Sequence, residues 1–104
     1  MNVDKLRDAI ESGQFEWRKH IIERLAERKI KQEEVLQTIL TGEKIEGHPQ
    51  AYPFPSALFF RKIAGSPLHV VVAFDEENDW AYIVTAYIAD LEHFENDFKT
   101  RRKQ

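Results

Sequence analysis

The stretch Leu68-His69-Val70-Val71-Val72-Ala73-Phe74 (68–74) is apolar on both alternating sides apart from His69. A strand with two apolar sides is typical of the interior of a sheet that is covered on both faces. Its valines also favour extended backbone, since β-branched side chains pack well on a pleated surface. We therefore expect a central strand here, in which the polar His69 needs an explanation.

Two more runs of strand-forming residues lie on either side of this stretch, at 57–63 and 80–88. The connections at Gly65-Ser66 and at the acidic turn 75–79 are short. Short connections join antiparallel neighbours, whereas parallel strands need a longer crossover. The three runs therefore predict an antiparallel meander.

Helical periodicity occurs on both sides of the strand runs. Apolar residues at helical spacing predict helices at 3–11, 15–28 and 32–41. Gly42 follows the third helix and suits a left-handed cap position. Asp90 is placed to cap a last helix that buries Leu91, Phe94 and Phe98. The pattern predicts an α+β fold: N-terminal helices packed on a three- to four-stranded antiparallel sheet, with a C-terminal helix.

Length and composition limit the class of protein. The chain has 104 residues, 42% of them hydrophobic, which fits a single domain over 1–104. The absence of a long apolar run and the charged N-terminus predict a cytoplasmic protein with no membrane partner. There is no cysteine, and the four histidines form no HisxHis or HisxxxHis pair. The sequence therefore predicts no metal centre and no cofactor.

Charge is distributed unevenly along the chain. The net charge is −3, which does not favour indiscriminate binding to nucleic acid. Residues 16–31 nevertheless hold six Lys or Arg against three Glu, a balance of +3. Four more cations lie among the last six residues. We therefore expect a local basic surface on an acidic protein.

A row of basic side chains recurs in the predicted helix 15–28. At about 100° per residue, His20, Arg24 and Arg28 lie within about 80° of one another, beside an apolar face that includes Trp17. An imidazole next to two guanidinium groups could bind a phosphodiester and transfer a proton near neutral pH. Alternatively, the arginines are a solvated flank that pairs with neighbouring glutamates.

A second polar cluster is expected on the sheet. If Phe74 pairs with Trp80 across the acidic turn, His69 lies opposite Thr85. Tyr87 is then diagonal to them on the same side of the sheet. Alternatively, this row is exposed to water at the strand end, with Tyr87 packed and His69 only hydrogen-bonded.

Lys62 joins this cluster in the same arrangement. Pairing of Ile63 with Leu68 places its side chain in the row that holds His69. A one-residue slip of either hairpin would separate these groups, because successive residues of a strand point to opposite faces.

Several pieces of the chain follow one another in a recognisable order. They are His20-x3-Arg24-x3-Arg28-x-Ile30, Val35…Gly42-Glu43-x-Ile45, Pro53…Ser56, Leu68-His69-Val70-Val71, Ile83-Val84-Thr85-Ala86-Tyr87 and Arg101-Arg102. Their order and spacing, over about residues 16–102, resemble the domain-of-unknown-function family 4258 (DUF4258). This resemblance implies a fold related to the compact RelE/ParE-like toxins of the barnase–EndoU–colicin–RelE group, in which helices precede an antiparallel sheet.

The resemblance also implies a function. Several members of that wider group cleave RNA without metal, while ParE-type members poison topoisomerases. We therefore predict a toxin-like, metal-independent endoribonuclease of a toxin–antitoxin-type system, with RNA as substrate and an antitoxin as partner. Such cleavage needs a base, an acid and cations that stabilise charge on phosphorus. The predicted catalytic residues are His20, His69, Thr85 and Tyr87, and the predicted substrate-binding residues are Arg24, Arg28 and Lys62.

Other interpretations stay open at this point. The chain could be a non-catalytic protein-interaction module of the same fold, which its net negative charge favours. It could also be a structural homodimer built on an exposed sheet edge at 57–63, through Phe59 or Phe60, unless these aromatics are ordinary core. Tyr52 could stack on a base of single-stranded RNA or pack beside its neighbouring prolines.

Overall fold

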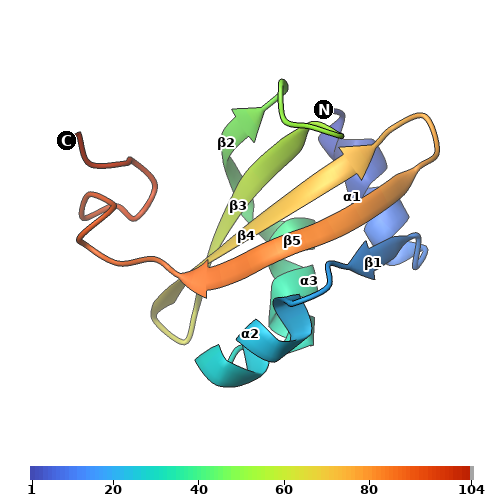
Figure 1. Ribbon diagram of the computed structural model, residues 1–104. Coiled ribbons are helices and arrows are strands. Elements are labelled where there is room, and N and C mark those ends of the chain that lie inside the picture. Colours follow the sequence, from blue (N-terminus) through green and yellow to red (C-terminus); the bar gives the residue numbers. More distant parts are fainter. Residues whose placement is uncertain (104) are drawn as a thin grey trace.

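A five-stranded mixed sheet is the centre of the structure, and helices cover one of its faces (Figure 1). This computed structural model describes residues 1–103. Within that range the elements, in chain order, are α1 (Val3–Glu11), β1 (Phe15–Trp17), α2 (Ile21–Arg28), α3 (Gln32–Thr41), β2 (Glu43–His48), β3 (Ser56–Ile63), β4 (Ser66–Asp75) and β5 (Trp80–Ile88). The spatial order of the strands is β1-β5-β4-β3-β2. The prediction of an α+β fold is confirmed, but the sheet has five strands and β1 runs parallel to β5, so the predicted three- to four-stranded antiparallel sheet is wrong.

The main core lies between the sheet and the helices. It contains buried apolar side chains from α1, α2, α3 and from β3, β4 and β5, among them Leu6, Leu25, Val35, Ile39, Phe59, Val70, Val72, Phe74 and Ile83. The strand 68–74 is central and buried, as its composition predicts. The core therefore fixes which face of the sheet the helices cover.

The prediction of a helix over residues 15–28 is wrong for the first part of this range. Residues 15–17 form β1, which runs parallel to β5 with Phe15 opposite Ala81 and Trp17 opposite Ile83. Phe15 and Trp17 both pack against the helix-side core, so their spacing is that of a strand. The helical part begins only after His20, which is the N-cap residue of α2.

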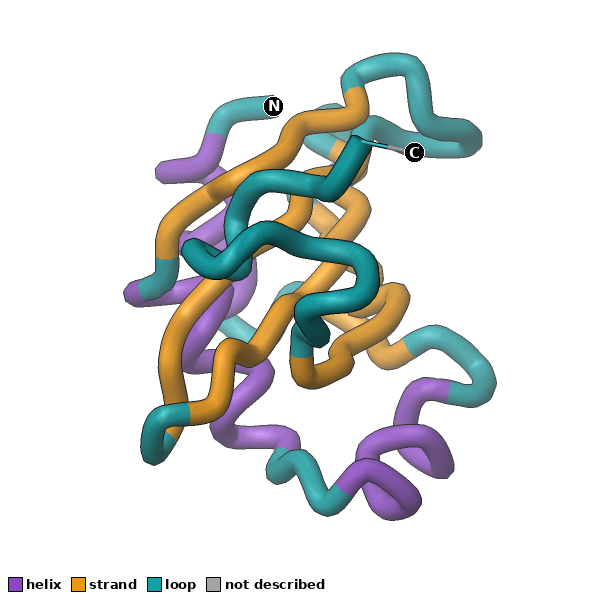
Figure 2. The backbone as a smooth tube through the Cα atoms, turned by 90° about the vertical axis from the view of Figure 1, so that its left-hand side faces the viewer, coloured by secondary structure: helices purple, strands orange, loops and turns teal. Residues whose placement is uncertain are grey.

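The prediction of a C-terminal helix is also wrong. Residues 89–103 form turns, with one isolated β-bridge between Phe94 and Arg101. The carboxylate of Asp97 accepts hydrogen bonds from the backbone N–H groups of Lys99 and Thr100. Such side-chain bonds compete with a helical backbone. Figure 2 shows this C-terminal segment (residues 89–103) as a loop in front of the strands.

The C-terminal segment covers part of the second face of the sheet, opposite the helices. Phe94 is buried there with Leu58 and Ala89, and Phe98 packs against the same cluster. Leu91, by contrast, is 49% exposed. The predicted burial therefore holds for Phe94 and in part for Phe98, although the backbone is not helical.

The strand at 57–63 is not a sheet edge, which removes the basis for the predicted homodimer. β3 lies between β4 and β2, and the sequence pattern does not predict the strand β2. Phe59 is fully buried in the core and Phe60 is partly buried. These aromatics are therefore internal packing groups.

The register of both hairpins differs from the prediction. Ile63 pairs with Ser66 instead of Leu68. Asp75, and not Phe74, pairs with Trp80, and a bulge between Val71 and Val72 shifts the ladder again. The register is shifted by one residue at the turn and by a second residue at the bulge. Because two shifts of one residue return a side chain to the same face of the sheet, His69 and Tyr87 still share a face, and His69 lies directly opposite Tyr87.

Helix α3 ends at Gly42, but not in the left-handed conformation that the sequence predicts. Gly42 has a φ of −80° and a ψ of 179°, which is extended backbone. No helix among residues 1–103 has the length and apolar composition needed to cross a bilayer.

Candidate functional site

Basic side chains converge on a cavity of about 400 Å³ beside β5. Its lining residues are Arg18, Lys19, His20, Ile21, Arg24, Arg28, Val84 and Thr85, and we call this cavity the basic groove. It forms because β1 pairs with β5 only as far as Ile83 and the chain then turns into α2. The edge of β5 beyond Ile83 therefore lies open beside the first turns of a basic helix.

Arg28 is fixed at this open edge. Its Nη1 donates a hydrogen bond to the carbonyl oxygen of Ala86 at 2.7 Å. That bond satisfies one carbonyl of the unpaired edge and uses only part of the guanidinium, which carries five N–H donors. The remaining donors of Arg28 are available for an anion in the groove.

Arg24 and His20 are held more loosely. Arg24 Nη1 lies 3.2 Å from a carboxylate oxygen of Glu27, and His20 Nδ1 lies 4.0 Å from Glu23. The side chains in these pairs are all more than half exposed to solvent. Exposed pairs of this kind contribute little to stability, so both side chains can turn toward a ligand.

Thr85 reaches the groove because of the β-bulge in β5. Val71 pairs with Thr85 and Val72 pairs with Ile83, so Val84 is the extra residue. Bulges re-aim side chains at the edges of sheets. The structure thus brings His20, Arg24, Arg28 and Thr85, from the two predicted clusters, to one cavity.

His69 and Tyr87 lie apart from the basic groove. His69 is fully buried under the C-terminal segment, between the rings of Phe60 and Phe94. Its Nε2 donates to the carbonyl oxygen of Phe98 at 2.6 Å, and its Nδ1 lies 3.4 Å from the hydroxyl of Tyr87. Burial lowers the pKa of His69 and raises the pKa of Tyr87.

These contacts separate two of the predicted catalytic residues, His69 and Tyr87, from the basic groove. An imidazole with no exposed surface cannot touch a bound RNA, so His69 is not placed to share proton transfer with His20. Tyr87 is partly buried against the same cluster and does not line the groove. Both residues instead attach the C-terminal segment to the sheet.

Lys62 is the third residue that the structure separates from the groove. It is exposed on β3, opposite Pro67, next to the β3–β4 turn. The prediction that it shares a cross-strand row with His69 depended on the register Ile63–Leu68, which is wrong. Phe60, not Lys62, pairs with His69.

Two groove residues were not selected from the sequence. Arg18 and Lys19 lie in the connection between β1 and α2, directly before His20. A helix running from residue 15 would have distributed these side chains around its surface. The basic triplet Arg18-Lys19-His20, just before the helix, was the available signal.

A second cavity, of about 350 Å³, lies between the end of β5 and the C-terminal segment. Tyr87, Asp90, His93 and Arg101 contribute its polar lining. The Asp90 carboxylate binds the His93 imidazole at 2.8 Å, which lowers the pKa of Asp90. Arg101 is already paired with Glu46, with Nε 2.7 Å from a carboxylate oxygen. The charged side chains of this cavity thus already have partners, and the partner of Arg101 lies outside it.

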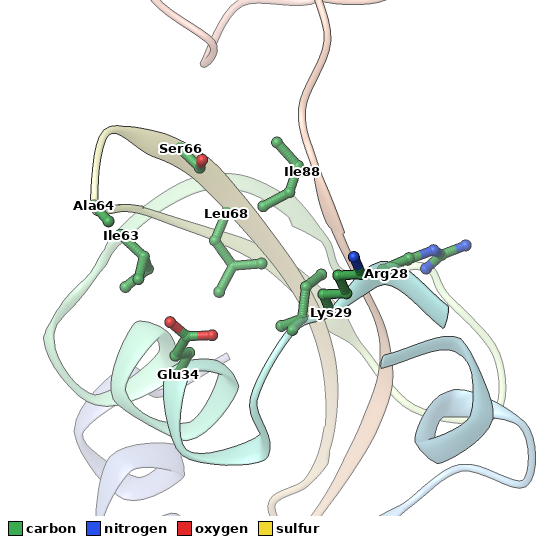
Figure 3. A pocket seen from close by; sticks show the side chains of 9 residues that line it. Arg28, Lys29, Glu34, Ile63, Ala64, Ser66, Leu68 and Ile88 are labelled. Atoms are coloured by element: carbon green, nitrogen blue, oxygen red, sulfur yellow. The ribbon is translucent and has the colours of Figure 1, made fainter. Parts of the chain in front are cut away.

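A third cavity, of about 200 Å³, lies next to the β3–β4 turn (Figure 3). In this view the Arg28 side chain points away from the cavity, whereas Glu34 points toward it. Glu34 also accepts a hydrogen bond from the backbone N–H of Lys31 at 2.9 Å. Most of the other lining side chains are apolar, including Ile63 and Leu68. This cavity lacks converging groups for chemistry, so the basic groove is the stronger candidate.

No group of three or more His, Cys, Asp or Glu side chains that could hold a metal ion occurs in the part of the chain that the structure describes. Among the same residues, the groove is lined by four permanently charged cations, which suit an anionic ligand. Guanidinium groups with free donors bind phosphate oxygens in a bidentate manner.

Fold and groove together define an α+β protein with a cationic groove at the open edge of a mixed sheet. Residues 17–88 match the family described as Domain of unknown function (DUF4258), and this range is more than half of the chain. The chain therefore belongs to the DUF4258 family. All the residues that line the groove lie within the matched range, and the C-terminal segment lies outside it. No curated protein and no solved structure gives a significant match.

Proposed function

We propose that this protein is a metal-independent endoribonuclease of a toxin–antitoxin-type system, with a fold related to the RelE/ParE-like toxins. The observation that carries the proposal is the convergence of His20, Arg24, Arg28 and Thr85 on one cavity. These residues supply an imidazole, two guanidinium groups and a hydroxyl. The order of elements, with α2 and α3 before an antiparallel set of strands, is consistent with the proposed fold relationship.

In the proposed reaction, His20 removes the proton from a ribose 2′-hydroxyl. The 2′-oxygen attacks the adjacent phosphorus, the bond to the 5′-oxygen breaks, and that oxygen takes a proton from a water molecule, whose hydroxide then takes the proton held by His20. The products are a 2′,3′-cyclic phosphate and a free 5′-hydroxyl. Arg24 and Arg28 bind the phosphate oxygens and stabilise the charge that develops on them. Thr85 donates a hydrogen bond that orients the same group.

The test is cleavage of an end-labelled RNA in EDTA. We expect wild-type protein to release cyclic-phosphate products and to leave the all-deoxy strand intact, because DNA lacks the nucleophile. Removal of a general base lowers rates by about 10²- to 10⁴-fold, which is the loss expected for His20→Gln. His48→Gln is the matched control, since His48 is exposed and lies outside the groove.

Two results would refute the ribonuclease. One is an absence of cleavage by wild-type protein over a range of RNAs, with or without added divalent metal. The other is unchanged cleavage by His20→Gln or by the pair Arg24→Gln and Arg28→Gln.

A specific observation also favours the non-catalytic interaction module. The edge of β5 beyond Ile83 carries no partner strand in the described part of the chain, and Val84 and Ile88 are 38% and 42% exposed. Open edges bind extended segments of other proteins. An antitoxin segment with acidic side chains would match the basic groove. Amide hydrogen exchange tests this: such a partner would protect residues 84–88, and protection elsewhere would argue against it.

A further inference from the structure

Three side chains from distant parts of the chain form a stacked array on the second face of the sheet. The rings of Phe54 and Tyr82 are nearly parallel, at 4°, with centroids 5.4 Å apart. The guanidinium carbon of Arg18 lies over the Tyr82 ring, 4.5 Å from its centroid. We call these three residues the stacking array.

The backbone positions each member before any ligand binds. Tyr82 stands on β5 opposite Ala73 of β4, whose small side chain leaves room above the sheet. The loop that carries Phe54 is tied to β4 by a hydrogen bond from the N–H of Phe74 to the carbonyl of Pro55, at 3.0 Å. Arg18 is held by a bond from its N–H to the carbonyl of Ile83, at 2.9 Å.

The array is continuous with the basic groove, because Arg18 belongs to both. All three residues are partly exposed. Because the Tyr82 ring lies between Phe54 and Arg18, a base would stack on the outer side of Phe54 or of the Arg18 guanidinium. Cations in the groove suit a phosphate backbone, and planar groups beside them suit bases. Single-stranded nucleic acids are bound by this combination of a charged groove with aromatic and arginine planes.

We propose that the stacking array is a base-binding subsite for single-stranded RNA whose phosphates lie in the basic groove. This inference rests on the proposed function and specifies its substrate class. A base leaves the strand and stacks on the array, while the next phosphate contacts the cations. A duplex binds more weakly because its bases already stack on one another. Stacking is tolerant of sequence, since every base has a planar face.

The experiment measures binding by fluorescence anisotropy with a labelled, short 2′-fluoro RNA strand, which cannot be cleaved by 2′-oxygen attack. We expect Phe54→Leu to weaken binding about tenfold, the usual effect of losing one stacked base, and Tyr82→Leu to weaken it as well because the ring that supports Phe54 is lost. Tyr82→Phe keeps the ring and should bind like wild type. Tyr52→Leu is the second control, because Tyr52 is 96% exposed in the same loop but outside the array.

Two further measurements separate stacking from charge. The salt dependence of binding should be unchanged in Tyr82→Leu and reduced in Arg24→Gln, since only the latter removes a phosphate contact. The wild-type protein should bind a strand with abasic sites, or the matching duplex, about tenfold more weakly than the intact strand. Thermal unfolding of each variant confirms that it is folded.

Clear results would overturn the inference. Equal affinity for intact and abasic strands would do so, as would losses in Tyr82→Phe or Tyr52→Leu as large as in Tyr82→Leu. Preferential binding of an acidic peptide with no binding of RNA would also refute it. If the array variants lose binding but wild-type protein cleaves no RNA, the base-binding subsite is supported and the proposed ribonuclease activity is refuted. If RNA is cleaved and Tyr82→Leu binds normally, the base-binding subsite is refuted and the ribonuclease activity is supported.

Discussion

Position 42 requires glycine because there is no space for a side chain around its backbone. A Cβ atom at this position would lie 2.4 Å from the carbonyl oxygen of Thr38 and 2.6 Å from that of Phe60. Both neighbours are backbone atoms, of α3 and of β3, and cannot turn away as a side chain can. The end of α3 therefore approaches the sheet so closely that only glycine fits.

We expect Gly42→Ala to lower the free energy of unfolding by roughly 3 kcal/mol, the upper end for overpacking. Urea unfolding monitored by circular dichroism measures the change. Gly47→Ala is the matched control on the neighbouring strand, because its Cβ would meet only the end of the Lys44 side chain, at 3.2 Å. Equal stability of the two variants would show that the close approach at Gly42 does not exist.

His69 is a structural residue in this fold. Its imidazole joins β4 to the C-terminal segment through the carbonyl of Phe98, and burial lowers its pKa. In the unfolded chain a histidine has a pKa near 6.5. As pH falls below that value, the unfolded state therefore binds more protons than the folded state.

Stability should consequently decrease as the pH is lowered from about 7 toward 5. We expect His69→Gln to reduce the slope of melting temperature against pH, since the amide can still donate to Phe98 but does not titrate. His48→Gln, which replaces an exposed histidine, should retain the wild-type slope. A wild-type slope in His69→Gln would mean that another group controls the acid sensitivity.

At the scale of elements, the C-terminal segment depends on a few attachments. Phe94 is 2% exposed, and the ion pairs Arg101–Glu46 and Lys99–Glu43 join the segment to β2 at 2.7 and 2.9 Å. Asp97 has its pKa lowered to about 2 by hydrogen bonds from the backbone of Lys99 and Thr100. Segments without regular structure open more easily than the sheet beneath them.

Phe94→Ala should release this segment without unfolding the sheet. Loss of a buried phenylalanine costs roughly 3 kcal/mol, which is enough to populate the open form. Limited trypsin digestion, followed by mass spectrometry, should show faster cleavage after Lys99 and Arg101. Leu91→Ala, at a position that is 49% exposed, should be cleaved like wild type. Unchanged cleavage of Phe94→Ala would contradict the anchoring role.

At the scale of the whole molecule, the net charge of −3 conceals a basic groove. Four permanent cations line that groove, whereas Glu76 and Glu77 lie in the β4–β5 turn outside it. Each phosphate that a cation contacts releases counterions from a single strand. The number of contacts, and not the net charge, therefore controls the salt dependence of binding.

With four phosphate contacts, the plot of log affinity for single-stranded RNA against log salt should have a slope of about −3. Neutralising Arg24 and Arg28 together should bring the slope to about half of that value. The control variant carries Glu76→Gln and Glu77→Gln, which alters the net charge but leaves the groove intact, and its slope should stay as in wild type. A slope that follows net charge would show that RNA does not bind in the groove.

Local patterns in the sequence were sufficient for much of the fold. The strand runs 57–63, 68–74 and 80–88 and the helices 3–11 and 32–41 are confirmed, because their periodicity continues over many residues. The prediction of helix at 15–17 is wrong, since three residues cannot distinguish a period of two from one of 3.6. The prediction of a C-terminal helix is wrong because polar side chains in this segment accept hydrogen bonds from the local backbone, which compete with helical hydrogen bonds.

The sequence by itself determined the α+β class, the central position of 68–74 and the basic character of residues 18–28, because these follow from local composition and spacing. The tertiary structure alone decided which polar residues meet. A bulge brings Thr85 to His20, and the fold of the C-terminal segment buries His69. One inserted residue changes the direction of a side chain, and sequence patterns do not encode such a shift in register.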